Sequence, residues 1–540
     1  MSMEIKGQVV SGKIAIGQIF VFRKRIPVIT SETTNDPEKE LSSFLLARDE
    51  AIEELKVLEE DATEKMGEEE AMVFSVHGML LEDQDFEEAV KEGINAGHNA
   101  SFAVKKAGDD LAAFFASMED NAYMNERAAD FKDIASRVIR KLQGIEDGIK
   151  LPEHPVILVA EDLVPSDTLG LEKEKVLAFV TSKGSTNSHT AILARSLGIT
   201  ALVNTGSEFS DDLTGQIGIV DGEKGVFTIE PDEETLSEYR RKKEEIQRED
   251  EELKQLIGKE TRTKGGQAIK LYANIGNPSD AVKALEYDAE GIGLFRSEFL
   301  FLGKNDYPSE EEQFENYKEV ITLMAGREVI IRTLDIGADK QADYFNLPKE
   351  ENPAMGLRAI RLCLERPEIF KTQLRAIYRA SAFGPVGIMF PMITSVEEID
   401  QILDLTETVK KELKDESISI GNVELGIMIE TPAAALISDL LAEKVSFFSI
   451  GTNDLTQYTF AMDRQNASLE PFRVPNHPAL LRLIEMTVQN AHKKKVRVGI
   501  CGEMGADFDL TKYFISIGVD ELSVSAPKIL ALRKHIRELA

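Results

Sequence analysis

The sequence of 540 residues contains only two cysteines, Cys363 and Cys501, which lie far apart within apolar segments. Two such residues cannot form a disulfide framework, so the sequence indicates a protein of the reducing cytoplasm. The N-terminal segment lacks the basic region, the unbroken apolar core and the cleavage site of a secretory signal. No apolar run reaches the length of about 18 residues that a membrane-spanning helix needs. We therefore expect a soluble, cytoplasmic protein without membrane insertion.

Basic residues are scarce relative to acidic ones. Lys and Arg total 63 against 95 Asp and Glu, which gives a formal net charge of -32. A surface with this charge repels nucleic acids and anionic membranes, so we expect neither as a partner. The acidity suits a basic protein partner, although solubility alone is an equally good explanation of it.

The hydrophobic patterns change along the chain and predict a multidomain α/β protein. Short strands near the N-terminus and again from about residue 152 enclose a segment in which apolar residues recur every three or four positions. A later stretch is almost wholly charged, which is typical of a solvated helix. The predicted parts are an α/β domain (1–30 plus 145–231), an inserted α-helical subdomain (31–144), a linker helix (232–260) and a C-terminal domain (261–540).

Eight β-rich runs alternate with helical patterns in the predicted C-terminal domain. The runs are IKLYANIG, GIGLF, VIIRTL, VGIMFPM, LGIMIE, VSFFSIG, VRVGICG and LSVSA. This regular alternation favours a (β/α)8 TIM barrel over an open doubly wound sheet. Functional groups of such a barrel gather at the carboxyl ends of its strands, so we expect the functional residues of this domain to follow the eight runs.

Chemically versatile side chains do follow the predicted strands at that end. They are Arg296, Arg332, Glu430, Asn453, Asp454 and Cys501. Planar guanidinium groups suit phosphate or carboxylate oxygens, and Arg358 and Arg464 are candidates to join them. Glu430 and Asp454 end neighbouring strands, and two carboxylates with room for water suit Mg²⁺. The pattern predicts a pocket for a small, highly anionic substrate with a divalent metal. The alternative is a buried network in which these charges only pair with one another.

A second candidate centre lies in the segment GSTNSHTAILARSLG, residues 184–198. His189 lies where a polar, glycine-containing loop meets a helix that we expect to begin at about Thr190. The free N–H groups and the dipole at a helix N-terminus favour a neutral imidazole and would stabilise a phosphoryl group on its ring, with Arg195 as a further positive charge. The alternative is an ordinary capping or core histidine.

Long motifs run through nearly the whole chain. They are SHTAILARSLG, GIGLFRSEFLF, IRTLDIGADK, EENPAMGLRAIR, IMFPMI, MIETPAA, FFSIGTNDLTQYTFAMDR and GICGEM. In sequence and in order these motifs resemble enzyme I of the bacterial sugar phosphotransferase system, the phosphoenolpyruvate–protein phosphotransferase family.

The resemblance implies a role for each candidate residue. His189 takes the phosphoryl group of phosphoenolpyruvate, Glu430 and Asp454 bind Mg²⁺, and Cys501 handles the proton that completes pyruvate. The implied substrate-binding residues are Arg296, Arg332, Arg358, Asn453, Asp454 and Arg464, with Lys340 in support. The resemblance also implies that the helical subdomain docks the carrier protein HPr, to which an acidic cluster near Glu68 is suited, and that the barrel forms a homodimer.

The chain departs from the usual pattern of that family at a few positions. The loop before His189 reads Gly184-Ser185-Thr186-Asn187-Ser188 where Gly-Gly-Arg-Thr-Ser is usual. Asn204 replaces a glycine, and Gly505 and Ala506 reverse the common order. These departures leave open a specialised paralogue with a different carrier, or a scaffold without catalysis. A phosphoenolpyruvate synthase or dikinase would need a large ATP-binding domain, for which residues 30–144 are too short and too helical.

Overall fold

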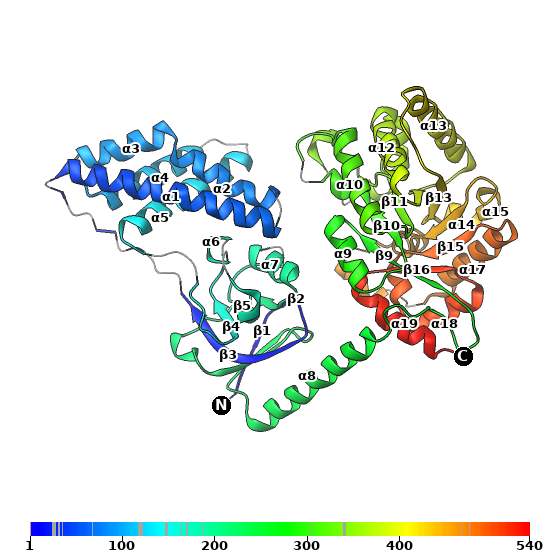
Figure 1. Cartoon of the computed structure of the whole chain (residues 1–540), viewed down its shortest axis with the longest axis horizontal. Helices are drawn as coiled ribbons and strands as arrows, with labels where there is room; N and C mark the ends of the chain where they lie inside the picture. Colours follow the sequence, from blue (N-terminus) through cyan, green and yellow to red (C-terminus); the bar gives the residue numbers. More distant parts are fainter. Residues whose placement is uncertain are drawn as a thin grey trace. The chain divides into compact units, whose positions relative to one another are not determined.

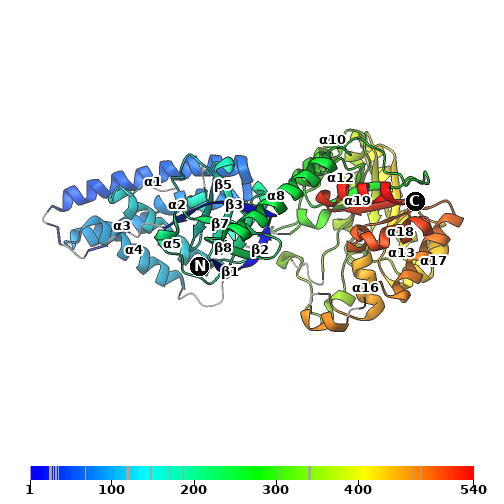
Figure 2. The ribbon, with the colours of Figure 1, turned by 90° about the horizontal axis from the view of Figure 1, so that it is seen from below.

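The structure is a computed structural model in which the chain forms two compact units, Met1–Gln247 and Arg248–Ala540. It describes residues 2–23, 27, 29–30, 33–34, 36–66, 68–116, 122–145, 149–163, 165–168, 171–186, 188–302, 304–337, 342–464, 466–472, 474 and 476–540. Within these residues, no helix has the length and apolarity that crossing a bilayer requires. The predicted fold class is confirmed by an α/β sheet with a helical segment, followed by a closed parallel barrel (Figures 1 and 2).

The first unit is built on a sheet with the strand order β1-β8-β7-β3-β4-β5-β6-β2. Its strands are β1 (Met3–Lys6), β2 (Gln8–Ser11), β3 (Ile14–Phe22), β4 (Val156–Ala160), β5 (Val176–Thr181), β6 (Thr200–Val203), β7 (Ile217–Asp221) and β8 (Val226–Ile229). β3 pairs in parallel with β4, although a long helical segment separates them in sequence. This helical segment is therefore inserted between two neighbouring strands of one sheet. The short helices α6 (Pro165–Thr168) and α7 (His189–Leu197) belong to the same α/β part.

The inserted segment forms a helical bundle with a hydrophobic core of its own. Its helices are α1 (Pro37–Met66), α2 (Glu68–Leu81), α3 (Gln84–Asn95), α4 (Ala100–Ala116) and α5 (Ala122–Leu142). Phe44, Phe86, Val104 and Phe131 are buried at its centre. After the sheet, α8 (Glu233–Lys254) buries none of its residues, as its charged sequence leads one to expect.

The second unit is a closed barrel of parallel strands with helices around it (Figures 1 and 2). The strands are β9 (Lys270–Ile275), β10 (Ile292–Arg296), β11 (Val329–Arg332), β12 (Val386–Phe390), β13 (Val423–Ile429), β14 (Phe447–Ile450), β15 (Arg497–Ile500) and β16 (Glu521–Val524). The helices are α9 (Pro278–Glu286), α10 (Glu310–Leu323), α11 (Ile360–Glu365), α12 (Pro367–Ala380), α13 (Val396–Asp415), α14 (Pro432–Leu436), α15 (Ser438–Leu441), α16 (Thr452–Phe460), α17 (Pro478–Lys493), α18 (Phe508–Ile517) and α19 (Ile529–Glu538). Each strand lies within one of the eight predicted runs or overlaps it.

The inside of the barrel is filled by side chains and is a core, not a channel. Leu294, Ile330, Met389, Met428, Phe447 and Cys501 form one buried cluster. A glycine on the neighbouring strand makes room for the largest of them, because a Cβ at Gly426 would overlap the ring of Phe447.

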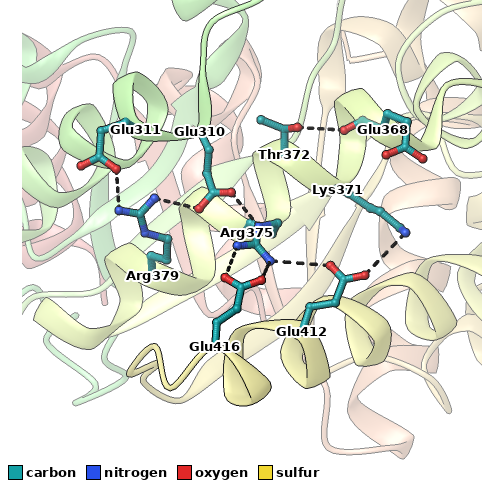
Figure 3. A network of polar contacts seen from close by, with 9 residues as sticks. All are labelled: Glu310, Glu311, Glu368, Lys371, Thr372, Arg375, Arg379, Glu412 and Glu416. Carbon is teal, nitrogen blue, oxygen red and sulfur yellow. Dashed lines mark hydrogen bonds and ion pairs between the residues drawn. The ribbon is translucent and has the colours of Figure 1, made fainter.

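On the outside of the barrel, a network of charges joins α10, α12 and α13 (Figure 3). Arg375 of α12 lies 2.6 Å from Glu310 of α10 and 2.6 Å from Glu416, which directly follows α13. One turn along α12, Arg379 contacts Glu310 at 2.7 Å and Glu311 at 2.6 Å. Both arginine side chains are only 18% exposed. The network therefore holds α12 firmly between its two neighbours.

The amino-terminal end of the barrel holds one carboxyl group with weak pairing. Glu521, at the start of β16, is 6% exposed, and its ion pair with Arg497 spans 4.0 Å. Arg497 makes closer contacts with Glu328 at 2.7 Å and with Glu424 at 2.9 Å. Burial raises the pKa of Glu521 to about 8.

We expect the substitution Glu521→Gln to stabilise the barrel at pH 8. In the unfolded chain Glu521 loses its proton near its ordinary pKa of 4.5, whereas the folded protein holds the proton up to about pH 8. Between these two pH values the stability of the wild type therefore falls as the pH rises, by up to about 1.4 kcal/mol per pH unit. Glutamine cannot ionise and removes this loss. Calorimetry of the full chain should show a higher barrel unfolding temperature for the variant at pH 8 and equal values near pH 4.5.

A matched control for this prediction is Glu424→Gln, which removes the more exposed carboxylate on the same Arg497. This variant should not show the gain in barrel unfolding temperature at pH 8 that we expect of Glu521→Gln. A stability difference for Glu521→Gln that is the same at both pH values would contradict the explanation.

Candidate active site

The strand register brings the predicted residues together at the carboxyl end of the barrel. Arg296 at the end of β10 lies beside Arg332 at the end of β11. Ile429, Ile450 and Ile500 are register partners across β13, β14 and β15. The residues that follow them, Glu430, Gly451 and Cys501, are therefore neighbours at this edge. The candidate residues follow five strands, β10, β11, β13, β14 and β15. They lie at one end of the barrel because a closed parallel barrel aligns the carboxyl ends of its strands.

Arg332 is held by two buried carboxylates from two different loops. Its Nη2 donates a hydrogen bond of 2.6 Å to Glu298, which follows β10, and lies 3.1 Å from Asp335, which follows β11. Burial alone would lower the pKa of Arg332, but Glu298 and Asp335 raise it above the ordinary value. The guanidinium is therefore charged and fixed in direction.

Arg358 shares the same carboxylate and extends the cluster to α16. Its Nη2 donates to Asp335 at 2.8 Å, and its Nη1 donates to the hydroxyl of Tyr458 at 3.1 Å. The same Nη1 lies 3.8 Å from Asp454. Asp454 and Tyr458 are four residues apart and so lie on one face of α16. The role of Tyr458 was not predicted, although this spacing was a signal that could have indicated it.

The surrounding protein satisfies only one of the two carboxylate oxygens of Glu430. It is 1% exposed; its Oε1 accepts a hydrogen bond of 2.6 Å from the N–H of Met392, and its Oε2 has no hydrogen-bond partner. Burial raises its pKa, and the nearby carboxyl groups of Asp454 and Asp335 raise it further. An ionised Glu430 therefore requires a positive charge beside Oε2.

The charge balance and the donor set fit a divalent cation held by Glu430 and Asp454. The cluster contains two buried guanidiniums, those of Arg332 and Arg358. It also contains four buried carboxyl groups, which belong to Glu298, Asp335, Glu430 and Asp454. A dication would offset the excess of negative charge and would give Glu430 Oε2 a partner. Among the described residues, no group of three or more His, Cys, Asp or Glu side chains could hold a metal. Mg²⁺ bound here would therefore take its other ligands from substrate and water, which is its usual preference.

Cys501 supplies a thiol that keeps its proton at neutral pH. It is buried at the end of β15, and its Sγ donates to the carbonyl oxygen of Ile450 at 3.7 Å. Burial raises its pKa to about 12, although the positive charge of Arg332 opposes this change. Such a group can donate a proton to a basic carbon or oxygen placed beside it.

The remaining predicted residues lie around this centre. Arg358, Asp454, Tyr458 and Arg464 line a cavity of about 440 Å³. The Oδ1 atom of Asn453 accepts a hydrogen bond of 3.0 Å from the N–H of Glu503 and so joins the loops after β14 and β15. Arg296 stacks on the ring of Phe299 at 5.1 Å, and its Nε is buried without a hydrogen-bond partner. The structure thus groups at one end those of the predicted barrel residues that it describes.

In the first unit, α7 begins at His189, one residue earlier than predicted. Its N-cap residue Ser188 makes no side-chain capping bond, so the N–H groups of the first turn have no acceptor from that cap. Gly184 has a φ of +94°, which favours glycine at this position. Arg195 donates to the carbonyl oxygen of Thr186 at 2.6 Å and so ties the loop to the helix. Asn187, Lys340 and the side chain of His189 lie outside the described part of the structure.

Comparisons with known proteins cover all of the chain. It matches the family models described as PEP-utilising enzyme, N-terminal (residues 6–127), mobile domain (152–225) and PEP-binding domain (250–540), where PEP is phosphoenolpyruvate. It is 41% identical to the phosphoenolpyruvate-protein phosphotransferase of Priestia megaterium, covering 100% of this chain and 95% of that protein. It is 43% identical to the protein of the same name from Bacillus subtilis, covering 99% and 95%.

Among solved structures, the chain is similar to an NMR solution structure of an enzyme I protein, with 37% sequence identity and a TM-score of 0.41. The match covers 45% of this chain and 99% of the chain in that structure. The full-length relatives and the three family models confirm the resemblance seen in the motifs. The chain therefore belongs to the phosphoenolpyruvate–protein phosphotransferase family of enzymes, which carry out phosphoenolpyruvate-dependent phosphotransfer.

Proposed function

We propose that the chain takes the phosphoryl group of phosphoenolpyruvate onto His189 and passes it to a histidine of HPr, with release of pyruvate. This is the first step of the sugar phosphotransferase system. The observation that carries the proposal is the buried charge cluster at the carboxyl end of the barrel. Two fixed guanidiniums lie there beside Glu430, whose Oε2 has no partner, and beside a protonated Cys501.

The arginines are suited to hold the two anionic ends of the substrate. We assign Arg296, Arg332, Arg358, Asn453, Asp454 and Arg464 to substrate binding. During phosphoryl transfer, charge develops on the oxygens around phosphorus, and guanidiniums that are already in place stabilise it without reorganisation. Mg²⁺ held by Glu430 and Asp454 would add charge neutralisation at the phosphate oxygens.

The transfer itself needs one nucleophile and one proton donor. A neutral ring nitrogen of His189 attacks phosphorus, and the bond between phosphorus and the enol oxygen breaks with its electron pair on that oxygen. The methylene carbon of the resulting enolate then takes the proton of the Cys501 thiol, which completes pyruvate. His189 and the arginines belong to different compact units. The units must therefore approach each other for the first transfer, and His189 must afterwards reach the carrier.

The same proposal assigns carrier docking to the helical segment α1–α5. Glu59 and Glu60 lie near the end of α1, and the chain as a whole carries a net charge of -32. A basic surface on the carrier would be attracted to such a face. The side chains of Asp61 and of Glu68 to Glu70, which complete the predicted acidic cluster, lie outside the described residues. We also propose that the chain has the four predicted domains, that it forms a homodimer through the barrel, and that it is located in the cytoplasm.

A labelling experiment tests the proposal. The full chain is mixed with Mg²⁺ and phosphoenolpyruvate that is radiolabelled in its phosphoryl group, without ATP. We expect acid-labile label on the chain, its transfer to added HPr, and no label on the variant His189→Ala. The matched control His154→Ala, at an exposed histidine of the same unit, should be labelled like the wild type. Label that requires ATP would indicate a dikinase-type enzyme, and the absence of label would contradict catalysis.

A further inference from the structure

Gln373 is a buried amide on the inner side of α12. Its side chain is 1% exposed, and its partners lie in two loops after barrel strands and on α10. Its Oε1 accepts a hydrogen bond of 2.8 Å from the N–H of Leu334. Its Nε2 donates to the hydroxyls of Ser297 at 2.9 Å and of Tyr317 at 3.1 Å. Because a backbone N–H can only donate, the orientation of the amide is set by Leu334.

Two of these partners belong to the loops that carry the candidate arginines. Ser297 lies between Arg296 and Glu298 in the loop after β10. Leu334 lies between Arg332 and Asp335 in the loop after β11. One side chain from a third element therefore joins the two loops directly.

The relative position of these loops decides the direction of Arg332. Its Nη2 is held by Glu298 at 2.6 Å from the first loop and by Asp335 at 3.1 Å from the second. A shift of one loop against the other would pull the two carboxylates apart and turn the guanidinium. It would also move Arg358, which is bound to the other oxygen of Asp335 at 2.8 Å.

We propose that Gln373 is a positioning residue for phosphoenolpyruvate binding, which sets the register of the Arg296 and Arg332 loops and thereby aims the guanidiniums. The inference rests on the proposed function of these arginines. Gln373 does not touch the substrate and acts through Ser297 and Leu334. The charged network on the outer side of α12 supports this role, because Arg375 and Arg379 fix the helix on which Gln373 stands (Figure 3).

The test is a comparison of steady-state kinetics for two glutamine variants of the full chain. Gln373→Leu introduces an apolar side chain of similar volume and removes both links. We expect the KM for phosphoenolpyruvate to rise about tenfold while kcat falls less than threefold, since misaimed guanidiniums weaken the bound substrate and transition state alike. Gln313→Leu is the matched control. Gln313 is also 1% exposed, and it bonds to Tyr317 and to Pro308, near the end of the connection from β10 to α10, but to neither Ser297 nor Leu334.

Each result decides between a positioning role and mere stabilisation. Equal KM values for Gln373→Leu and Gln313→Leu would overturn the proposal, even if both variants lost stability. If Gln373→Leu does not fold, Ser297→Ala breaks one link alone, and it must raise KM for the proposal to stand. Arg332→Lys is measured in parallel. An unchanged KM for Arg332→Lys contradicts the proposed function itself, whereas an increase there without one for Gln373→Leu removes only the positioning role.

Discussion

Replacing Glu430 by glutamine should lower turnover with phosphoenolpyruvate at least about a thousandfold and raise the thermal stability of the metal-free protein. Glutamine keeps the acceptor for the N–H of Met392 but removes the negative charge. Without a cation, burial and then the carboxyl groups of Asp454 and Asp335 raise the pKa of Glu430 to about 8, so at pH 7 folding requires a proton that the unfolded chain does not hold. Glutamine needs no proton and therefore stabilises the fold at pH 7, by about 1 kcal/mol or more. The same change removes a ligand that the proposed Mg²⁺ site requires.

Two measurements on the full chain check this prediction. Pyruvate release reports turnover, and unfolding temperatures with and without Mg²⁺ report both stability and metal binding. Mg²⁺ should raise the unfolding temperature of the wild type and not that of Glu430→Gln. Glu503→Gln, at an exposed carboxylate that follows β15, is the control and should behave like the wild type. A Glu430→Gln variant that Mg²⁺ still stabilises fully would exclude Glu430 as a metal ligand.

Replacing Cys501 by alanine should slow the formation of pyruvate about a hundredfold to ten thousandfold, the usual range for the loss of a general acid. The buried thiol has a pKa of about 12 and therefore carries a proton throughout the neutral range. Without it, the enolate that remains after phosphoryl transfer must take its proton from water. The carboxylates and guanidiniums of the site are unchanged, so binding of phosphoenolpyruvate and Mg²⁺ should persist.

Rapid-quench measurement of pyruvate in a single turnover checks the role of Cys501. Cys363→Ala is the matched control, because Cys363 is the other buried cysteine of the chain and burial raises its pKa too. It lies on α11 and not directly after a barrel strand. Its variant should form pyruvate at the wild-type rate. A Cys501→Ala variant with a rate within twofold of the wild type would exclude the thiol as the acid.

The barrel and the location of its site were predictable from local patterns. Each of the eight strands is a short apolar run, and regular alternation with helices has one common solution, a closed parallel barrel. Closure places all carboxyl ends on one face, so Arg296, Glu430 and Cys501 had to lie at the same end of the barrel however far apart they are in sequence. The insertion of the helical segment between β3 and β4 followed from strands on both sides of it.

The partners within the site were not predictable in this way. The alternative that the charges pair with one another describes Arg332 and Arg358, which both bind Asp335, but not Glu430. Which carboxylate finds a guanidinium depends on side-chain directions at the strand ends, and no spacing in the sequence encodes them. The same holds for Tyr458 and Gln373, which reach the site from helices.

The sequence by itself determined the strands, the order of the parts, and the end of the barrel at which the chemistry gathers, because strand and helix periods are local properties. Only the tertiary structure decided that one amide on α12 joins two arginine loops and that one oxygen of Glu430 has no hydrogen-bond partner. These features depend on how helices rotate and pack against the barrel, and packing is settled by contacts between residues distant in sequence.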